Sequence, residues 1–164
     1  MENAGMGHTR INDRCQGWRS TVQVAFVAGF SPIVRDPATS RAFYADALGL
    51  SFEGEEGAYV FTEKLGGVKH LGLWPLSEAA QACFDTPEWP GGIPVPQATV
   101  EFEVGTVEAV EAAAKELEGR GYRLIHPAKT EPWTQTITRL LSPDGLLVGV
   151  YYTPSFHEEG RGGS

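Results

Sequence analysis

The sequence predicts an α+β fold built from two similar modules, each with the order strand, helix and three strands (βαβββ). A strand-like segment followed directly by a capped helix occurs twice, the second time about 70 residues after the first. Three short strand-like segments then follow each helix. A proline-rich stretch separates the two copies. We therefore expect modules at about 22–75 and 97–153, joined by a link at 76–96.

The first module begins at 22–34, where apolar and small residues alternate loosely, as in a strand covered on both faces. Asp36 is suited to cap the next helix, and Pro37 is suited to its first turn. Gly49 should end this helix near Leu48. Glycines separate the three strand candidates that follow, at 50–53, 58–63 and 68–74.

The link contains several prolines and the pair Gly91-Gly92, with room for a short helix at about 77–83. Its length is typical of a lid or of a linker. In the second module, 98–104 alternates apolar and polar residues as a strand does. Thr106 should cap a helix at 106–119, whose apolar positions follow a 3.6-residue period. Strands are then expected at 122–125, 134–141 and 146–152.

The composition excludes several classes of function. A chain of 164 residues with 41% apolar content is enough for one packed domain. The net charge of −8, from 21 acidic and 13 basic side chains, argues against nucleic-acid binding and favours neutral or cationic ligands. Apolar runs are too short to span a bilayer, so we expect no membrane partner. The motifs of nucleotide-binding loops, zinc peptidases and serine hydrolases are missing from the sequence.

The cysteines and the two ends of the chain favour a cytoplasmic protein. Cys15 and Cys83 lack the spacing of a disulfide framework or a metal site, so we expect reduced thiols. Residues 1–21 lack the apolar stretch of a signal peptide and are expected to form a disordered leader. Residues 154–164 are rich in glycine and charge and are expected to form a flexible tail. The expected domain is therefore 22–153.

Three segments carry short motifs: VRDP…S…FY…LGL at 34–50, EPW followed by Gln135 at 131–135, and SPDG at 142–145. Their order and spacing resemble the VxD…S…FY…LGL, PWGQ and DPDG signatures of the vicinal oxygen chelate superfamily, which includes glyoxalases, bleomycin-resistance proteins and extradiol dioxygenases. Thr134 replaces the glycine of the second signature, and Ser142 replaces the first aspartate of the third. The resemblance implies that the two modules form a curved mixed sheet around a cleft, usually within a homodimer.

The resemblance also implies where a metal would bind. Metal enzymes of the superfamily take histidine, glutamine or glutamate ligands from the first and last strands of each module. Counting along the motifs places three of these positions at Gly29, Thr99 and Gly149, which are poor ligands or none. The fourth lies near 69–73, and one ligand would not hold a metal. We therefore expect no metal and no cofactor, as in the antibiotic-binding branch of the superfamily.

Two carboxylates are the main candidates for ligand binding. Glu101 and Glu103 share the strand face opposite Val100 and Phe102, and the resemblance implies that this face lines the cleft. Carboxylates there could bind a cationic or hydrogen-bond-donating ligand, or one of them could act as a general base. The alternative is that both face solvent at the rim of the cleft.

Aromatic and polar side chains complete the candidate site. Some of five aromatic rings are expected to stack against a flat ligand, and packing in the core or in a dimer is the alternative for each of them. The five are Trp133, Trp74, Tyr59, Phe61 and Tyr151. Gln135 and Arg139 share a strand face and could orient a polar edge of the ligand, and Thr99 lies beside Glu101 on its strand. For His70 and His126 we favour structural roles.

The interpretation that these features favour is a homodimer that binds an aromatic or cationic small molecule, as in antibiotic sequestration. One alternative is an enzyme of the same fold, acting as an isomerase, lyase or thiol transferase, with or without a divalent metal. Another is a regulatory module whose cleft has no function of its own.

Overall fold

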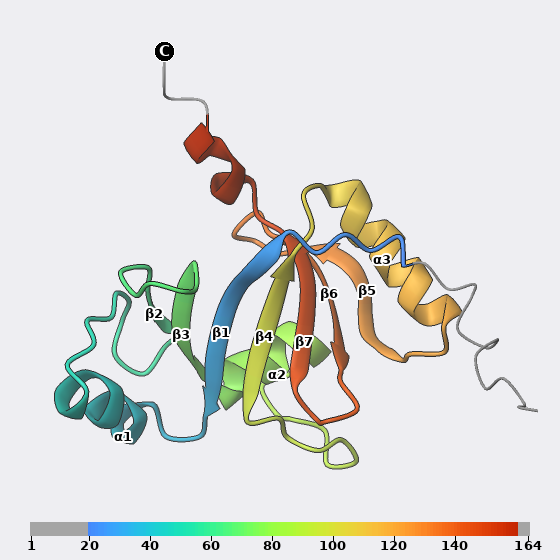
Figure 1. The fold of residues 1–164 in the computed structure, drawn as a ribbon. Helices are drawn as coiled ribbons and strands as arrows, with labels where there is room; N and C mark the ends of the chain where they lie inside the picture. Colours follow the sequence, from blue (N-terminus) through green and yellow to red (C-terminus); the bar gives the residue numbers. More distant parts are fainter. Residues whose placement is uncertain (1–19, 161–164) are drawn as a thin grey trace, which may run out of the picture.

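A computed structural model describes residues 20–160 and shows a seven-stranded mixed sheet with the order β2-β3-β1-β4-β7-β6-β5 (Figure 1). The elements along the chain are β1 (Phe26–Val34), α1 (Pro37–Arg41), the π-helix η1 (Ala42–Ala47), β2 (Val60–Thr62), β3 (His70–Pro75), α2 (Leu76–Phe84), β4 (Ala98–Glu103), α3 (Val107–Gly119), β5 (Leu124–Thr130), β6 (Thr136–Leu141), β7 (Leu147–Tyr152) and the 3-10 helix η2 (Pro154–Gly160).

The expected repeat is visible in the strand pairing. In each module the first strand pairs in parallel with the last, β1 with β3 and β4 with β7. The two first strands, β1 and β4, pair antiparallel and join the modules into one sheet. The centre of the sheet therefore consists of the first strands of both modules.

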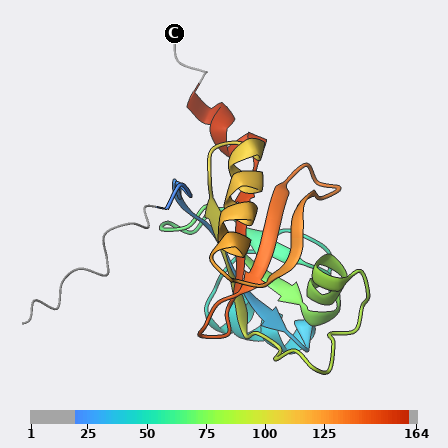
Figure 2. The same cartoon turned by 90° about the vertical axis from the view of Figure 1, so that its right-hand side faces the viewer.

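Helices cover both faces of this sheet. The helices α1 and η1 pack near β3 through a cluster that contains Val34, Leu73 and Tyr44, and α3 packs on the same face through Val110 and Val150. The helix α2 packs on the opposite face, behind the strands in Figure 1 and beside β5 in Figure 2.

The face that carries α2 is concave. Arg139 on β6 places its guanidinium 5.3 Å from the ring of Trp74 on β3, although three strands lie between them. In a flat sheet with strands about 4.8 Å apart, no side chain could span that distance. The sheet therefore curves around the α2 face, as the motif resemblance implied.

The helix starts agree with the expected capping residues. Asp36 accepts a hydrogen bond from the backbone N–H of Thr39, and Thr106 accepts one from Ala109. The expected helix at 37–48 is present as α1 followed directly by η1. No helix in the described range 20–160 is long and apolar enough to cross a membrane.

Two expectations about the strands and one about the C-terminal segment need correction. The segment 50–53 forms a single bridge, from Glu53 to Phe61, instead of a strand. The first strand begins at Phe26, later than expected, and is not covered on both faces, because Val27 and Phe30 are 44% and 41% exposed.

The expected leader lies outside the described residues except for 20 and 21. The segment from Pro154, expected as a flexible tail, forms η2.

Candidate functional site

The concave face encloses a cleft of about 900 Å³. Its floor is the centre of the sheet, and α2, β2, the 131–135 turn and the start of the C-terminal segment form its walls. Four aromatic rings of the sheet and turn line it: Tyr59, Phe61, Trp74 and Trp133. Five carboxylates line it as well: Glu63, Glu78, Asp85, Glu101 and Glu131. Two fixed cations oppose them, Lys129 and Arg139.

One row of paired residues crosses the floor of the cleft from β3 to β5. In strand order it consists of His70, Gly29, Glu101, Gly149, Arg139 and His126. Residues that pair across neighbouring strands place their side chains on the same face. The row therefore presents a histidine, a carboxylate, a guanidinium and a second histidine to one surface, with glycines beside the carboxylate.

The first glycine of the row allows its neighbours to meet. His70 Nε2 lies 3.3 Å from Glu101 Oε2, directly above Gly29. A Cβ atom at Gly29 would lie 2.6 Å from Glu101 Oε2 and closer still to His70 Nε2. The residue at 29 must therefore be glycine for this contact to form. Glu101 is only 7% exposed.

A second polar pair lies beside the first. The hydroxyl of Tyr59 reaches over Gly72 toward Ser31, where a Cβ at Gly72 would lie 2.7 Å from the Ser31 Oγ. Burial raises the pKa of Tyr59, and the charge of Glu101 raises it further. Tyr59 is therefore a neutral phenol that can donate a hydrogen bond inside the cleft.

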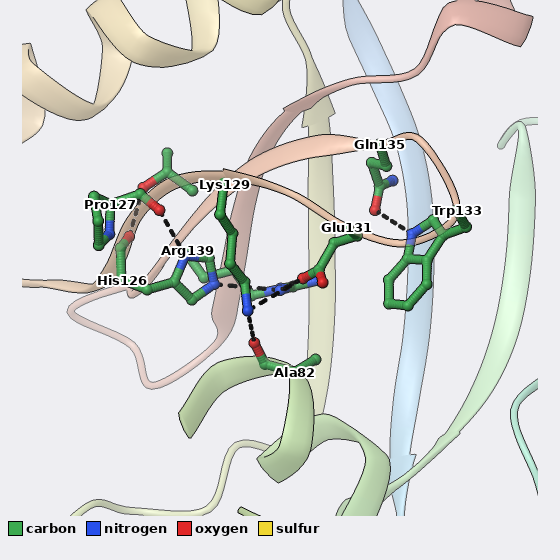
Figure 3. A network of polar contacts seen from close by, with 9 residues as sticks. Ala82, His126, Pro127, Lys129, Glu131, Trp133, Gln135 and Arg139 are labelled. Atoms are coloured by element: carbon green, nitrogen blue, oxygen red, sulfur yellow. Dashed lines mark hydrogen bonds and ion pairs between the residues drawn. The ribbon is translucent and has the colours of Figure 1, made fainter. Parts of the chain in front are cut away.

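At the other end of the row, Arg139 is held in a polar network (Figure 3). Its Nη1 donates to Glu131 Oε1 at 2.8 Å and lies 3.3 Å from His126 Nε2. Burial lowers the pKa of His126, and the charges of Arg139 and Lys129 act in the same direction. A neutral His126 fits both of its contacts, because Nδ1–H can donate to the Pro127 carbonyl at 2.8 Å while Nε2 accepts from Arg139.

Lys129 belongs to the same network. Its Nζ donates to the Ala82 carbonyl of α2 at 2.8 Å and lies 3.6 Å from Glu131 Oε1. Two cations therefore share the single carboxylate of Glu131. The network also fixes α2 against the β5–β6 hairpin, which closes this end of the cleft.

The 131–135 turn brings Trp133 to the rim of the cleft. Thr134, which stands where the superfamily signature has glycine, adopts a φ of 71°, in the left-handed region that favours glycine. The Trp133 Nε1 donates to Gln135 Oε1 at 3.1 Å, and the Trp133 side chain is 56% exposed (Figure 3). The indole ring of Trp133 is therefore held at the rim of the cleft with much of its surface exposed, where a ligand can stack against it.

The structure brings six of the eight expected ligand-binding residues to the cleft. These are Thr99, Glu101, Trp74, Trp133, Gln135 and Arg139. Glu103 and Tyr151 are fully buried and do not line it. Glu103 instead accepts hydrogen bonds from the backbone N–H of Thr153, at 3.1 Å, and from His157, at 2.7 Å.

Sequence reasoning missed several residues of the cleft. We favoured a structural role for His70, which lies against Glu101, and we did not name Lys129, Glu131 or Phe156 as site residues, although Glu131 begins the EPW motif. The signal for His70 was its place in the 69–73 segment. Phe156 could not be expected from a segment interpreted as a flexible tail. Cys83 is a buried free thiol whose pKa burial raises to about 11, so little of it is thiolate at neutral pH. Cys15 lies outside the described residues.

Comparison with known proteins identifies the family. Residues 28–150 match the sequence model of the Glyoxalase/Bleomycin resistance protein/Dioxygenase superfamily. The chain belongs to this superfamily. No curated protein matches the sequence.

Solved structures share the superfamily fold at low identity. The NAD-dependent benzaldehyde dehydrogenase from Legionella pneumophila has a TM-score of 0.52 and 17% identity, covering 76% of this chain and 96% of that one. A homoprotocatechuate 2,3-dioxygenase variant from B. fuscum has a TM-score of 0.54 and 21% identity, covering 79% of this chain and 32% of that one. A superfamily member from Vibrio splendidus has a TM-score of 0.49 and 21% identity, covering 76% of this chain and 96% of that one. At these identities the first two similarities establish the fold alone.

The pairing corrects where the metal-ligand positions of the superfamily lie in this chain. Counting along the motifs placed three of them at Gly29, Thr99 and Gly149. In the sheet, however, Glu101 is the residue that pairs with both glycines, and Thr99 pairs with Ser31 and Leu147. Counting back from the helix caps failed because the cap lies seven residues after Gly29 but five after Glu101.

The donor set does not fit the metal of the superfamily. His70 and Glu101 are the two side chains at these positions, and Gly29 and Gly149 supply none. Within residues 20–160 no group of three or more histidine, cysteine or acidic side chains could hold a metal ion. Zinc sites in proteins use three or four such ligands, and this cleft offers two.

Proposed function

We propose that this protein binds a small aromatic cation in its cleft, without a metal and without transforming it. The observation that carries the proposal is the Glu101 carboxylate. It is 7% exposed, it lines the cleft, and His70 at 3.3 Å is its one partner among the described residues. A carboxylate held in a cleft beside one imidazole can accept a charge-assisted hydrogen bond from a cationic ligand, which is stronger than a hydrogen bond between neutral groups.

The charge around Glu101 supports a cation. The cleft contains five carboxylates, and the two cations that oppose them both contact Glu131, away from Glu101 on the sheet. The whole chain also carries a net charge of −8. The field in the cleft therefore attracts positive ligands.

The size and the rings of the cleft support an aromatic ligand. A volume of about 900 Å³ lies within the range of small-molecule sites. Tyr59 and Phe61 stack with ring centroids 6.1 Å apart on one wall, and Trp133 lies on another. Sequestration of such a ligand, for example an antibiotic, by a cytoplasmic homodimer is the role we propose.

An enzyme of the same fold is the second candidate, and the His70–Glu101 contact is the observation that favours it. A carboxylate held next to an imidazole inside a cleft can act as a general base in an isomerase, lyase or thiol transferase, with or without a divalent metal. Elemental analysis of protein purified without chelator separates the metal-dependent form of this candidate from the proposal. Stoichiometric nickel, zinc, manganese or iron would contradict the metal-free proposal.

Calorimetric titration with benzylamine, a simple aromatic cation, tests the proposal. Glu101→Gln keeps the shape of the side chain and removes its charge, so it should weaken binding by about 1.5–3 kcal/mol, the value of a hydrogen bond to a charged group. Glu56→Gln is the matched control, because Glu56 is exposed and does not line the cleft. Equal affinities of the wild type and Glu101→Gln would contradict the proposal.

A further inference from the structure

We propose that the cleft contains a second subsite, centred on Arg139, which binds a carboxylate of the same ligand. The ligand would then be a zwitterion, with its cation at Glu101 and its carboxylate at Arg139. This inference rests on the proposed function and adds to it the chemical class of the ligand.

The first support is a buried donor without a partner. Arg139 is 1% exposed and lines the cleft. Its Nη1 is used by Glu131 and His126, but its Nε has no acceptor among the described residues. A buried N–H without an acceptor costs free energy that a ligand oxygen would restore. The hydroxyl of Thr99, 2% exposed and also without a partner, offers a further polar contact in the cleft.

The second support is the local charge. Arg139 and Lys129 both contact Glu131, at 2.8 and 3.6 Å, so one carboxylate faces two cations. His126, which completes the network, is held neutral by burial and by these cations. The network therefore has one positive charge in excess, and an anion would balance it.

The geometry of the guanidinium favours a carboxylate over other anions. Arg139 lies over the ring of Trp74, which fixes the plane of its donors. The edge of a guanidinium that includes Nε can donate two parallel hydrogen bonds to the two oxygens of a carboxylate. A doubly charged anion such as phosphate would be repelled by the five carboxylates of the cleft.

The two subsites are separated by one strand. Glu101 and Arg139 belong to the same row on the floor of the cleft, with Gly149 between them. Their Cα atoms are therefore about two strand spacings apart, or roughly 10 Å. The charged groups themselves end beside different residues of β3, because the Glu101 carboxylate meets His70 while the Arg139 guanidinium lies over Trp74. Those two residues are four positions apart, or roughly 13 Å along the strand, which suits a ligand whose charges lie at opposite ends of a ring.

Three probes with one benzene ring test this inference by calorimetry: 4-(aminomethyl)benzoate, benzylamine and 4-methylbenzoate. They carry both charges, the cation alone and the anion alone. We expect the zwitterion to bind the wild type at least tenfold more tightly than benzylamine. Arg139→Lys keeps the charge but loses the two-donor edge, so it should bring the zwitterion close to the affinity of benzylamine for the same variant.

The outcomes separate this inference from the proposed function. Equal binding of zwitterion and benzylamine by the wild type would overturn the carboxylate subsite and leave the cation site intact. Binding of 4-methylbenzoate, weakened by Arg139→Lys, without binding of benzylamine would support the subsite and contradict the proposed cation site. If none of the three probes binds, both proposals are wrong. The comparison on the wild type does not depend on the folding of the variant.

Discussion

At the scale of single residues, β4 reverses the usual relation between polarity and burial. Thr99, Glu101 and Glu103 are 2%, 7% and 0% exposed, while Val100 and Phe102 on the other face are only partly buried. The alternation could be predicted from the sequence, because side chains alternate along any strand. The period alone does not say which face is buried, since that depends on the elements that pack on each side.

Gly29 allows a direct test of the His70–Glu101 contact. Gly29→Ala should separate the two side chains, because the added Cβ would take the space in which they meet. The colliding atoms are the tips of flexible side chains, so we expect a loss of about 1 kcal/mol in the free energy of unfolding, the lower end for overpacking. Urea unfolding measures this loss. Titration with benzylamine should show weaker binding, since Glu101 would be displaced.

Gly66→Ala is the control for this prediction. A Cβ at Gly66 meets no atom within 4 Å, and its φ does not lie in the left-handed region. Its effect on stability should stay within about 0.5 kcal/mol. If Gly29→Ala behaves like Gly66→Ala in both measurements, the contact over Gly29 is not formed in solution.

At the scale of elements, the sequence predicted the helices better than the strands of the first module. Asp36 and Thr106 correctly predicted where two helices start, because a capping residue binds backbone groups only a few positions away in the sequence. The α2 helix was expected within the link, but its packing on the concave face was not, since the cluster of Trp74 and Leu147 beneath it is formed by distant strands. The segment 50–53 has glycines on both sides and lacks a full strand partner.

The η2 segment is anchored on a buried carboxylate, which predicts a dependence of stability on pH. Burial raises the pKa of Glu103, although the hydrogen bonds from His157 and Thr153 lower it. The folded protein therefore binds the Glu103 proton more tightly than the unfolded chain does. The wild type should gain stability from this group as the pH falls through the raised pKa.

Glu103→Gln tests this dependence, because it retains the shape and lacks the charge. The variant should have a higher free energy of unfolding than the wild type at pH 7, and the difference should shrink as the pH falls to about 4.5. Urea unfolding at both pH values measures it. His157 contacts the same oxygen and can gain a charge at low pH, so the pair is also compared in a His157→Ala background. A variant less stable than the wild type at pH 7 would show that the hydrogen bonds to Glu103 outweigh its burial.

At the scale of the whole molecule, the fold could be predicted because the module repeat and the motifs are read along the chain. The candidate site could be predicted only in part, since its key contacts join residues far apart in sequence. His70 meets Glu101 because β1 pairs with both β3 and β4, and Arg139 meets Trp74 because the sheet curves. Neither the register nor the curvature is encoded in a local pattern.

The face opposite the cleft predicts how two copies associate. Between α1 and α3 the strands β1 and β4 have no helix in front of them (Figure 1). Phe30 and Val27 are exposed there, and they pair with Val100 and Phe102 on the same surface. Adjacent apolar side chains left in contact with water on a sheet face indicate a contact surface. We expect a second copy to cover it, in a symmetric homodimer.

Light scattering after gel filtration at tens of micromolar protein tests this assembly. The wild type should have the mass of a dimer, and Phe30→Glu should have the mass of a monomer, because a charge at the centre of an apolar interface loses its hydration without gaining a partner. Lys115→Glu is the control, since it also introduces an acidic side chain but lies on α3, where Lys115 is exposed. A monomeric wild type would contradict the homodimer. A Phe30→Glu variant that remains dimeric would place the interface elsewhere, at the open edges of the sheet formed by β2 and β5.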